Sequence, residues 1–201
     1  PPETLRGKRV RGQGGNDDDE PLRNDMIVEN DVILGELLAW LEDPNGDGDT
    51  SDSIAANTLL LLTSDNGADK GYYAPIRDKK ASIYEGGHRV PFIARWPGRV
   101  PVGAVNSAAF SLVDLYASFA AMTGTAPAAG SAEDSHNILP ALLAAQPKLP
   151  VRPAMLHQTA GGADVFAVRE GPWKLIIEKG QPRELYNLQQ DLKESRNVLA
   201  G

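Results

Sequence analysis

The residues best suited to chemistry lie in one polar turn, Ser64-Asp65-Asn66-Gly67, which follows an apolar run at positions 59–62. A short apolar run bounded by turn residues predicts a fully buried strand, and ligands of open α/β sheets bind just beyond the carboxyl ends of such strands. Asp65 and Asn66 therefore stand where hard oxygen ligands can meet a divalent cation such as Ca2+ or Mg2+. The alternative interpretation is that Asp-Asn-Gly is simply a favourable turn sequence.

A second group of chemically useful residues follows this turn. Lys79 and Lys80 precede the segment Tyr-Glu-Gly-Gly-His-Arg-Val-Pro at positions 84–91, and Arg77 stands shortly before them. The order Ser-Asp-Asn-Gly, Arg-x-x-Lys and Tyr-Glu-Gly-Gly-x-Arg-Val-Pro, with its spacing and apolar flanks, resembles the type I sulfatases of the alkaline-phosphatase-like superfamily. The combination is far more specific than any of its pieces.

The resemblance implies a role for each matching residue. Asp65 and Asn66 match the pair that binds the active-site divalent cation, usually Ca2+, with Mg2+ as the alternative. Lys80, five residues before Glu85, matches the catalytic lysine that contacts the sulfate of the substrate. Arg77 matches the arginine that often precedes this lysine. The implied activity is that of a sulfuric ester hydrolase acting on a sulfate ester.

The resemblance covers only the second half of such an enzyme, from about Leu5 to the end of the chain. The family's nucleophile is a formylglycine made from Cys or Ser in a Cys/Ser-x-Pro-x-Arg motif. This chain has no cysteine, and none of its serines is followed by x-Pro-x-Arg. We expect the nucleophile and the remaining metal ligands in a missing N-terminal half of the same polypeptide. The isolated chain is therefore predicted to be inactive and to bind the cation weakly.

The expected fold class is α/β: the second half of an alkaline-phosphatase-like α/β sandwich plus a small C-terminal antiparallel sheet with a terminal helix. Apolar residues at helical spacing predict a helix at 24–42 and another at 113–123, and a short helix or turn is expected at 137–144. We predict residues 1–148 as the C-terminal part of the catalytic α/β domain, and residues 149–201 as a small β-sheet subdomain.

The sheet of this subdomain is predicted from a change of pattern after Pro150. Short apolar runs separated by Gly and Pro turns predict strands at 154–158, 165–169, 173–177 and 184–188. Trp173 and Tyr186 are expected in the core of this sheet, because large aromatic side chains bury much apolar surface.

A separate acidic loop at positions 43–53 reads DPNGDGDTSDS. Its oxygen-bearing side chains stand at alternate positions: Asp43, Asn45, Asp47 and Asp49. This pattern resembles the first half of an EF-hand or dockerin calcium loop, but Ile54 stands where the closing bidentate acid is required. The loop is interpreted as a weak secondary calcium site or, alternatively, as an acidic insertion, and in neither case as the catalytic metal site.

Three other residues have competing interpretations. Arg89 has a structural interpretation, in which it pairs with Glu85, and a functional one, in which it contacts an anion. His136 is interpreted as a loop residue, since nothing around it has metal-ligand spacing. His157 is interpreted as a sheet residue, with the border of the substrate pocket as the alternative.

Composition excludes several partners and functions. A net charge of −7 argues against nucleic acid, and no apolar run approaches the ~20 residues that a membrane span needs. Without cysteine, disulfides and Cys-ligated metals are excluded. A periplasmic or secreted location follows from the resemblance alone. Two rival functions remain: a phosphatase or phosphonate hydrolase of the same superfamily, which normally has extra His and Asp ligands, and a non-catalytic calcium-binding fragment.

Overall fold

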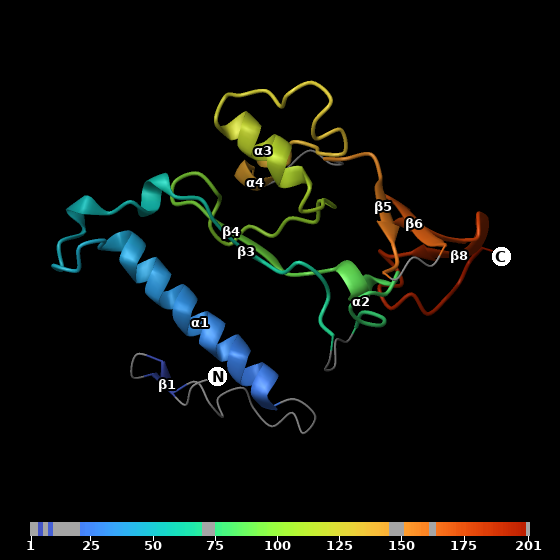
Figure 1. The fold of residues 1–201 in the computed structure, drawn as a ribbon, viewed down its shortest axis with the longest axis horizontal. Helices are drawn as coiled ribbons and strands as arrows, with labels where there is room; N and C mark the ends of the chain where they lie inside the picture. Colours follow the sequence, from blue (N-terminus) through green and yellow to red (C-terminus); the bar gives the residue numbers. More distant parts are fainter. Residues whose placement is uncertain are drawn as a thin grey trace. The chain divides into compact units, whose positions relative to one another are not determined.

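The computed structural model describes residues 4–5, 8–9, 21–69, 75–144, 151–160 and 164–199. Its helices and strands (Figure 1) are β1 (Thr4–Leu5), β2 (Lys8–Arg9), α1 (Pro21–Glu42), η1 (Thr50–Asp52), η2 (Ala55–Asn57), β3 (Leu60–Thr63), α2 (Glu85–His88), β4 (Phe92–Arg95), α3 (Asp114–Met122), α4 (Leu139–Leu143), β5 (Met155–Gln158), β6 (Val165–Glu170), β7 (Trp173–Glu178) and β8 (Gln181–Asn187). Among these residues the strands form the sheets β1-β2, β3-β4 and β5-β6-β7-β8. No helix in this part of the chain is long and apolar enough to cross a membrane.

The chain divides into two compact units, Pro1–Leu60 with Arg95–Gly98, and Leu61–Ala94 with Arg99–Gly201. This division follows proximity in space, so the predicted boundary between residues 148 and 149 stays a prediction. The helices and strands predicted at stated residue ranges are present, with their ends shifted by a few residues.

Helix α1, in the first unit, leaves much of its apolar stripe exposed. The helix begins at Pro21, a position at which the missing N–H of proline costs no helical hydrogen bond. Near its end Leu41 is buried, and Oε1 of Glu42 lies 2.8 Å from Nη2 of Arg95. Large apolar side chains exposed by 40% or more stand along the helix: Met26, Ile27, Ile33, Leu37 and Trp40.

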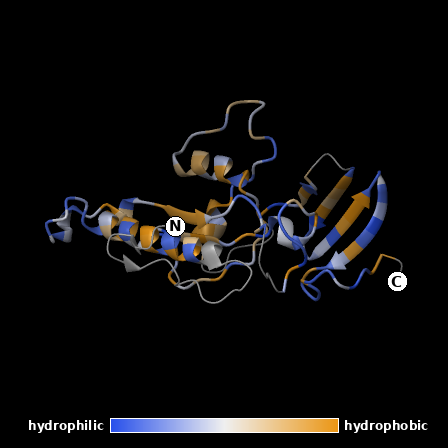
Figure 2. Ribbon diagram, turned by 60° about the horizontal axis from the view of Figure 1, so that its bottom comes forward, coloured by the Kyte–Doolittle hydropathy of each residue, from blue (hydrophilic) through white to orange (hydrophobic). Residues whose placement is uncertain are grey.

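The C-terminal sheet, in the second unit, is an antiparallel meander from β5 to β8. Lys179 and Gly180 join β7 to β8, and both have positive φ, 51° and 74°, as a two-residue hairpin turn requires. Hydrophobic and hydrophilic residues alternate along these strands (Figure 2). The buried core cluster consists of Ile83, Ala167, Ile176, Tyr186 and Leu188. Because Ile83 comes from the segment just before α2, this segment packs into the core of the sheet.

Helix α3 is anchored by a buried carboxylate. Asp114 is fully buried, and Nη1 of Arg152 donates to its two carboxylate oxygens at 3.0 and 2.9 Å. The backbone N–H groups of Ser111 and His136 also donate to this carboxylate, at 2.7 and 2.8 Å. The helix ends as Gly124 adopts a positive φ of 69°.

Two expectations about burial are wrong. Strand β3 is only partly buried, with Leu62 exposed by 38%, because among the described residues β3 pairs with β4 alone. Trp173 is exposed by 45%, because it lies on the sheet face opposite to the buried Lys174 and Ile176. Tyr186 is buried, as predicted.

The expected terminal helix is also absent from residues 188–199, which form turns and irregular structure. The carboxylate of Asp191 accepts hydrogen bonds from the backbone N–H groups of Ser195 and Arg196, at 2.8 and 2.7 Å. Hydrogen bonds from side chain to local backbone compete with those of a helix, which explains the irregular path.

Candidate active site

The turn after β3 presents two oxygen-bearing side chains. Asp65 is exposed and Asn66 is half-buried. Oδ1 of Asp65 accepts hydrogen bonds from the Asn66 N–H at 2.9 Å and from the Ser64 hydroxyl at 3.4 Å. The Nδ2 group of Asn66 donates to the Gly67 carbonyl at 2.9 Å, which leaves the amide oxygen for another partner. The turn therefore offers a carboxylate and an amide oxygen to a ligand.

The backbone of the predicted catalytic lysine lies against the end of this turn. The Lys80 N–H donates to the carbonyl of Ala68, two residues beyond Asn66, at 3.0 Å. The Lys80 side chain is exposed. The fold thus brings together the backbone segments of Asp65, Asn66 and Lys80. Within the described part of the chain, the Lys80 side chain makes no hydrogen bond or ion pair with Asp65 or Asn66, so the shared site stays a prediction.

Three glycines allow these segments to meet at backbone distance. The Gly67 N–H donates to the Gly87 carbonyl at 2.9 Å, and a methyl group on Gly67 would lie 1.7 Å from the Gly86 carbonyl oxygen. A methyl group on Gly86 would lie 2.1 Å from the carbonyl oxygen of Asp78, and one on Gly87 would lie 2.0 Å from that of Ser82. No side chain fits at these positions, so the glycines fix the turn against α2.

Helix α2 begins with a buried charge cluster. Glu85, Lys174 and Glu194, from α2, β7 and the segment after β8, are all fully buried. Nζ of Lys174 lies 3.1 Å from Oε1 of Glu85 and 2.8 Å from Oε1 of Glu194, the second contact being an ion pair without hydrogen-bond geometry. Oε2 of Glu194 accepts the backbone N–H of Glu85 at 2.7 Å. Burial raises the pKa of the Glu194 carboxyl despite the charge of Lys174.

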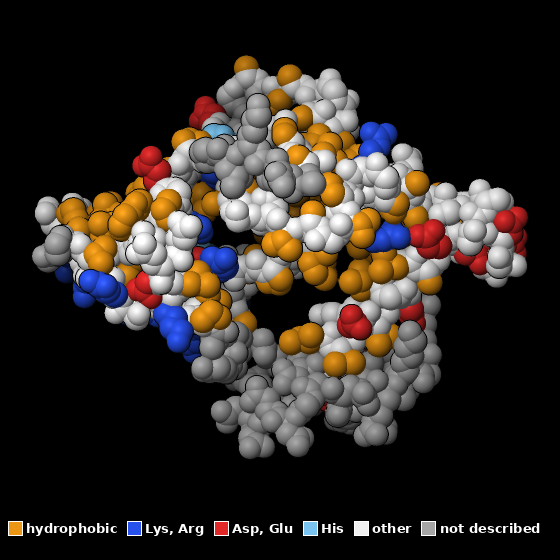
Figure 3. Space-filling view, turned by 180° about the vertical axis from the view of Figure 1, so that it is seen from behind, with side chains coloured by type: hydrophobic (Ala, Val, Ile, Leu, Met, Phe, Trp, Pro, Cys, Tyr) orange, Lys and Arg blue, Asp and Glu red, His pale blue; other side chains and the backbone are white. Residues whose placement is uncertain are grey.

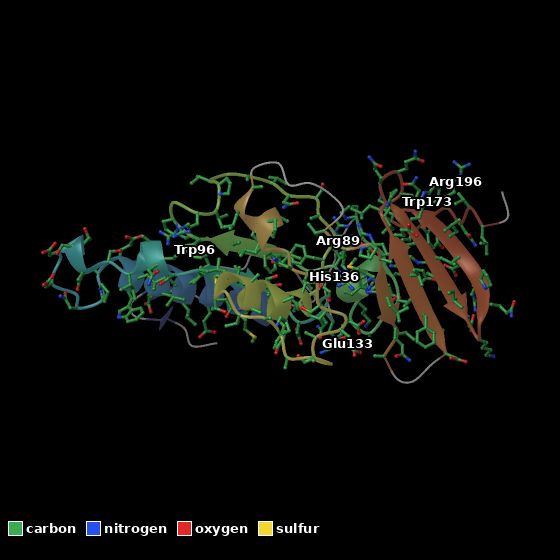
Figure 4. The ribbon with its side chains drawn as sticks, turned by 90° about the horizontal axis from the view of Figure 1, so that it is seen from above. Arg89, Trp96, Glu133, His136, Trp173 and Arg196 are labelled. Atoms are coloured by element: carbon green, nitrogen blue, oxygen red, sulfur yellow. The ribbon has the colours of Figure 1, made fainter. Side chains whose placement is uncertain are left out.

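Other basic side chains surround Glu85. Its carboxylate oxygens lie 3.2 Å from Nε2 of His88, 3.2 Å from Nη1 of Arg89 and 3.7 Å from Nη1 of Arg169. Burial opposes ionisation of Glu85, but the hydrogen bond with His88 and the charges of Lys174, His88 and Arg169 outweigh it and hold the pKa well below its usual range. The pairing of Arg89 with Glu85 confirms the structural interpretation of Arg89, which lies beside α2 (Figure 4).

Arg77 connects the loop before α2 to the C-terminal sheet. Its Nη1 donates to the Tyr186 hydroxyl at 3.2 Å and to the Glu194 carbonyl at 2.9 Å, and its guanidinium carbon lies 3.6 Å from the centre of the Tyr84 ring. The Tyr186 hydroxyl donates to Oε2 of Glu184 at 2.6 Å. Burial and this hydrogen bond raise the pKa of Tyr186 to about 12. Arg77 therefore holds the loop in place through contacts within the protein.

Two histidines stack beside the cluster. The rings of His88 and His157 lie 4.0 Å apart between centroids, at 21°. His157 lies on β5, as predicted, and its Nε2 is buried without a hydrogen-bond partner among the described residues. Burial and the neighbouring charge of His88 lower the pKa of His157 to about 3. His136 lies in a loop, also as predicted.

The acidic loop at 43–53 is held by its own backbone. Asp43 accepts N–H groups of Gly46 and Gly48 at 2.8 and 2.9 Å. The side chains of Asn45, Asp47 and Asp49 each accept the N–H two residues further on, at 2.9, 2.8 and 2.9 Å. Within the described ranges, no three His, Cys, Asp or Glu residues gather in a way that could hold a metal ion. Calcium binding by this loop stays a prediction.

Comparisons with known proteins show which family the chain is similar to. Residues 11–125 match the Sulfatase family. A sulfatase of Formosa agariphila is 32% identical over 186 residues, which cover 85% of this chain and 34% of the relative. The N-acetylgalactosamine-6-sulfatase of Canis lupus familiaris is 34% identical over 157 residues, which cover 75% of this chain and 28% of the relative.

Solved structures share the fold. The crystal structure of Ps i-CgsB in complex with k-i-k-neocarrahexaose has a TM-score of 0.75 and 28% identity, covering 92% of this chain and 40% of that chain. A Bacteroides thetaiotaomicron structure, from work on the metabolism of multiple glycosaminoglycans, has a TM-score of 0.71 and 29% identity, covering 88% and 40%. The fold is thus that of part of an alkaline-phosphatase-like α/β sandwich, as predicted. Within that class, the chain belongs to the sulfatase family. It spans about a third of the length of the curated relatives that it matches.

Proposed function

We propose that the chain is part of a sulfatase that hydrolyses sulfate esters, in which Asp65 and Asn66 bind a divalent cation and Lys80 contacts the sulfate. The observation that carries this proposal is the backbone junction between the turn, the lysine segment and α2. There the Gly67 N–H donates a hydrogen bond to the Gly87 carbonyl, and the Lys80 N–H donates one to the Ala68 carbonyl. Because both contacts are made by backbone, the segments keep their relative positions whatever rotamers their side chains adopt.

The donor set of the turn fits a hard cation. Carboxylate and amide oxygens suit Ca2+, our first choice, and also Mg2+. The Asn66 amide uses its N–H end on the Gly67 carbonyl, and Asp65 is exposed, so an oxygen of each can face a ligand. When bound, the cation would polarise the oxygens of the sulfate group. Since Ca2+ takes about six to eight oxygen ligands, the others are proposed to come from outside this chain.

Lys80 supplies a compact positive charge on a flexible stem. Its backbone is held at Ala68, next to the turn of residues 64–67 that carries Asp65 and Asn66, called the ligand turn below. Its exposed side chain is free to reach a substrate. An ammonium group that meets the sulfate neutralises its negative charge, which is most useful where charge develops in the transition state.

We propose that the formylglycine nucleophile lies in another part of the same polypeptide. The chain spans 34% of its Formosa agariphila relative, which leaves most of such an enzyme outside these residues. Large apolar side chains such as Ile93, Tyr116 and Phe119 are exposed on the described residues, and covering them with a further part of the polypeptide would be favourable. Figure 3 shows hydrophobic side chains at several places on one face. We propose that the isolated chain is inactive and that the whole enzyme works in the periplasm or outside the cell.

A sulfated saccharide is the substrate class that we favour. One relative is named an N-acetylgalactosamine-6-sulfatase, and the Ps i-CgsB structure holds a neocarrahexaose. Another relative is an arylsulfatase A, so an aryl sulfate serves as a chromogenic probe.

The test uses the full polypeptide that contains these residues, assayed with an aryl sulfate, an aryl phosphate and N-acetylgalactosamine 6-sulfate. We expect sulfate release that stops on chelation and returns with Ca2+ or Mg2+. Asp65→Ala and Lys80→Ala should each lower kcat/KM at least about 100-fold, the usual cost of losing a group that stabilises developing charge. Lys79→Ala, an exposed neighbour, is the matched control and should leave the rate unchanged.

The other outcomes separate the rival functions. Faster turnover of the phosphate would favour a phosphatase or phosphonate hydrolase. Metal binding without turnover of either ester would favour a non-catalytic calcium-binding role. Full activity of Asp65→Ala would contradict the assignment of the metal site.

A further inference from the structure

The buried cluster of Glu85, Lys174 and Glu194 is not explained by stability alone. All three side chains are fully buried, and two carboxylates share one lysine. Taking ions out of water commonly costs as much as their attraction returns, so apolar residues of similar volume often give equal or greater stability. What such a cluster can supply is one fixed geometry for the segments that carry its members.

The geometry that the cluster fixes is that of the first residue of α2. Lys174 holds the Glu85 side chain at 3.1 Å, while Oε2 of Glu194 holds the Glu85 backbone N–H at 2.7 Å. This N–H has no acceptor within the helix, as is usual for the first turn. Glu194 therefore caps α2 from a distance of 109 residues along the chain.

Backbone contacts of the next two residues of α2 connect the helix to the ligand turn. The Gly86 N–H donates to the Arg77 carbonyl at 2.8 Å, which ties α2 to the loop that leads to Lys80. The Gly87 carbonyl accepts the Gly67 N–H, and the contact between Gly67 and Gly86 leaves no room for a methyl group. A displacement of α2 therefore moves the ligand turn as well.

We propose that Lys174 and Glu194 are positioning residues of the sulfatase site. Both side chains are fully buried, so they are positioning residues without access to substrate or cation. They hold Glu85, and through the glycines of α2 they set the turn that carries Asp65 and Asn66. The catalytic consequence rests on the proposed function, whereas the mechanical link between Glu194 and the turn does not.

Hydrogen exchange at the Gly67 amide tests the mechanical link in the full polypeptide. Glu194→Ala removes the acceptor of the Glu85 N–H, and we expect Gly67 to exchange at least about tenfold faster, as local opening becomes easier. Glu194→Gln keeps an oxygen at that site and should restore much of the protection. Arg183→Gln is the matched control, because it removes the ion pair of an exposed residue with Glu178 in the same sheet and should leave Gly67 unchanged.

A calcium titration of aryl sulfate turnover tests the catalytic consequence. Glu194→Ala should need at least about tenfold more Ca2+ for half-maximal rate, the usual effect of disturbing residues that orient metal ligands. A purely structural role would reduce the amount of folded enzyme without changing this calcium requirement. Glu194→Gln should return most of the calcium affinity.

These readouts keep the two proposals separate. If the unmodified polypeptide does not hydrolyse the sulfate, the proposed function fails, and Gly67 exchange still decides the link. If Glu194→Ala does not fold, Glu85→Gln replaces it, since it neutralises one carboxylate and leaves Lys174 paired with Glu194. Hydrogen exchange at the Gly67 amide should then become at least about threefold faster, because local opening becomes easier. Unchanged Gly67 exchange in the folded variants would overturn the proposal.

Discussion

A methyl group on Gly67 would lie 1.7 Å from the carbonyl oxygen of Gly86. The turn that carries the proposed metal ligands and the helix α2 therefore meet backbone to backbone, with no side chain between them. Real Cβ atoms do not approach an oxygen so closely, so one of the two segments must move when Gly67 is replaced.

Gly67→Ala should therefore displace the ligand turn. We expect kcat/KM of the full polypeptide for an aryl sulfate to fall about 100-fold, since a shift of about 1 Å in a catalytic group has an effect of this order. Gly35→Ala in α1 is the control, because nothing lies within 4 Å of a methyl group there. It should keep full activity and add about 0.5–1 kcal/mol of stability. Equal activities of the two variants would show that the junction does not set the site.

Arg152→Met should destabilise the chain. The substitution leaves the fully buried carboxylate of Asp114 without its cation, and breaking a buried pair in this way costs about 3–5 kcal/mol. We expect a value near the lower end, because Asp114 keeps two backbone N–H donors. Arg95→Met removes the more exposed pair with Glu42 and should cost less than about 1 kcal/mol. Urea denaturation measures both, and similar losses for the two variants would be inconsistent with a buried anchor at α3.

His157 should make stability depend on pH. Its pKa is about 3 in the folded chain, against 6.5 for an unperturbed histidine, the value expected in the unfolded chain. Between these values the unfolded chain binds a proton that the folded chain does not, so stability is full above 6.5 and falls as the pH drops towards 3. The slope for one proton is at most about 1.4 kcal/mol per pH unit.

His157→Phe tests this pH dependence, because it removes the titrating group and keeps an aromatic ring against His88. Urea denaturation across the same pH window should show a flatter profile for the variant than for the original chain. Parallel profiles would mean that His157 does not titrate in this way. Leu156→Ala on the same strand, at an exposed position, is the control and should leave the slope unchanged.

The acidic loop should keep its structure without calcium. Its side chains already accept the loop's own N–H groups, so no ion is needed to order them. If the loop binds Ca2+ with a Kd of about 1 mM, then ~1 mM Ca2+ adds only about 0.4 kcal/mol. A chelator should then lower Tm by about 1 °C, as scanning calorimetry can measure. A large fall that Asp47→Ala abolishes would show a strong site instead.

Local patterns in the sequence were sufficient to predict helices α1 and α3, the strands and the turn at Asp65, but they wrongly predicted a terminal helix. The apolar periods and the Gly and Pro turns that predict β5 to β8 act over a few residues, and the structure follows them. The burial of β3 could not be predicted in the same way. It depends on which strands flank β3, and among the described residues only β4 does.

The charge cluster shows what local patterns cannot reveal. Glu85 and Glu194 are separated by 109 residues, and no short-range signal pairs them. Only one hint was present: Lys174 alternates with Ile176 on β7, so both face the same buried side of the strand. A lysine in that position needs a buried anion, and the sequence alone does not say which carboxylate provides it.

The cap of α2 also has a consequence for the order in which the protein is made. During translation Glu85 of α2 is synthesised 109 residues before Glu194, and the ligand turn is synthesised earlier still. The turn therefore first exists without the Glu194 carboxylate that accepts the Glu85 N–H of α2. The site can reach its final form only after translation has passed that codon. A stop codon shortly before it would yield a chain with every proposed ligand present and the anchor of α2 missing.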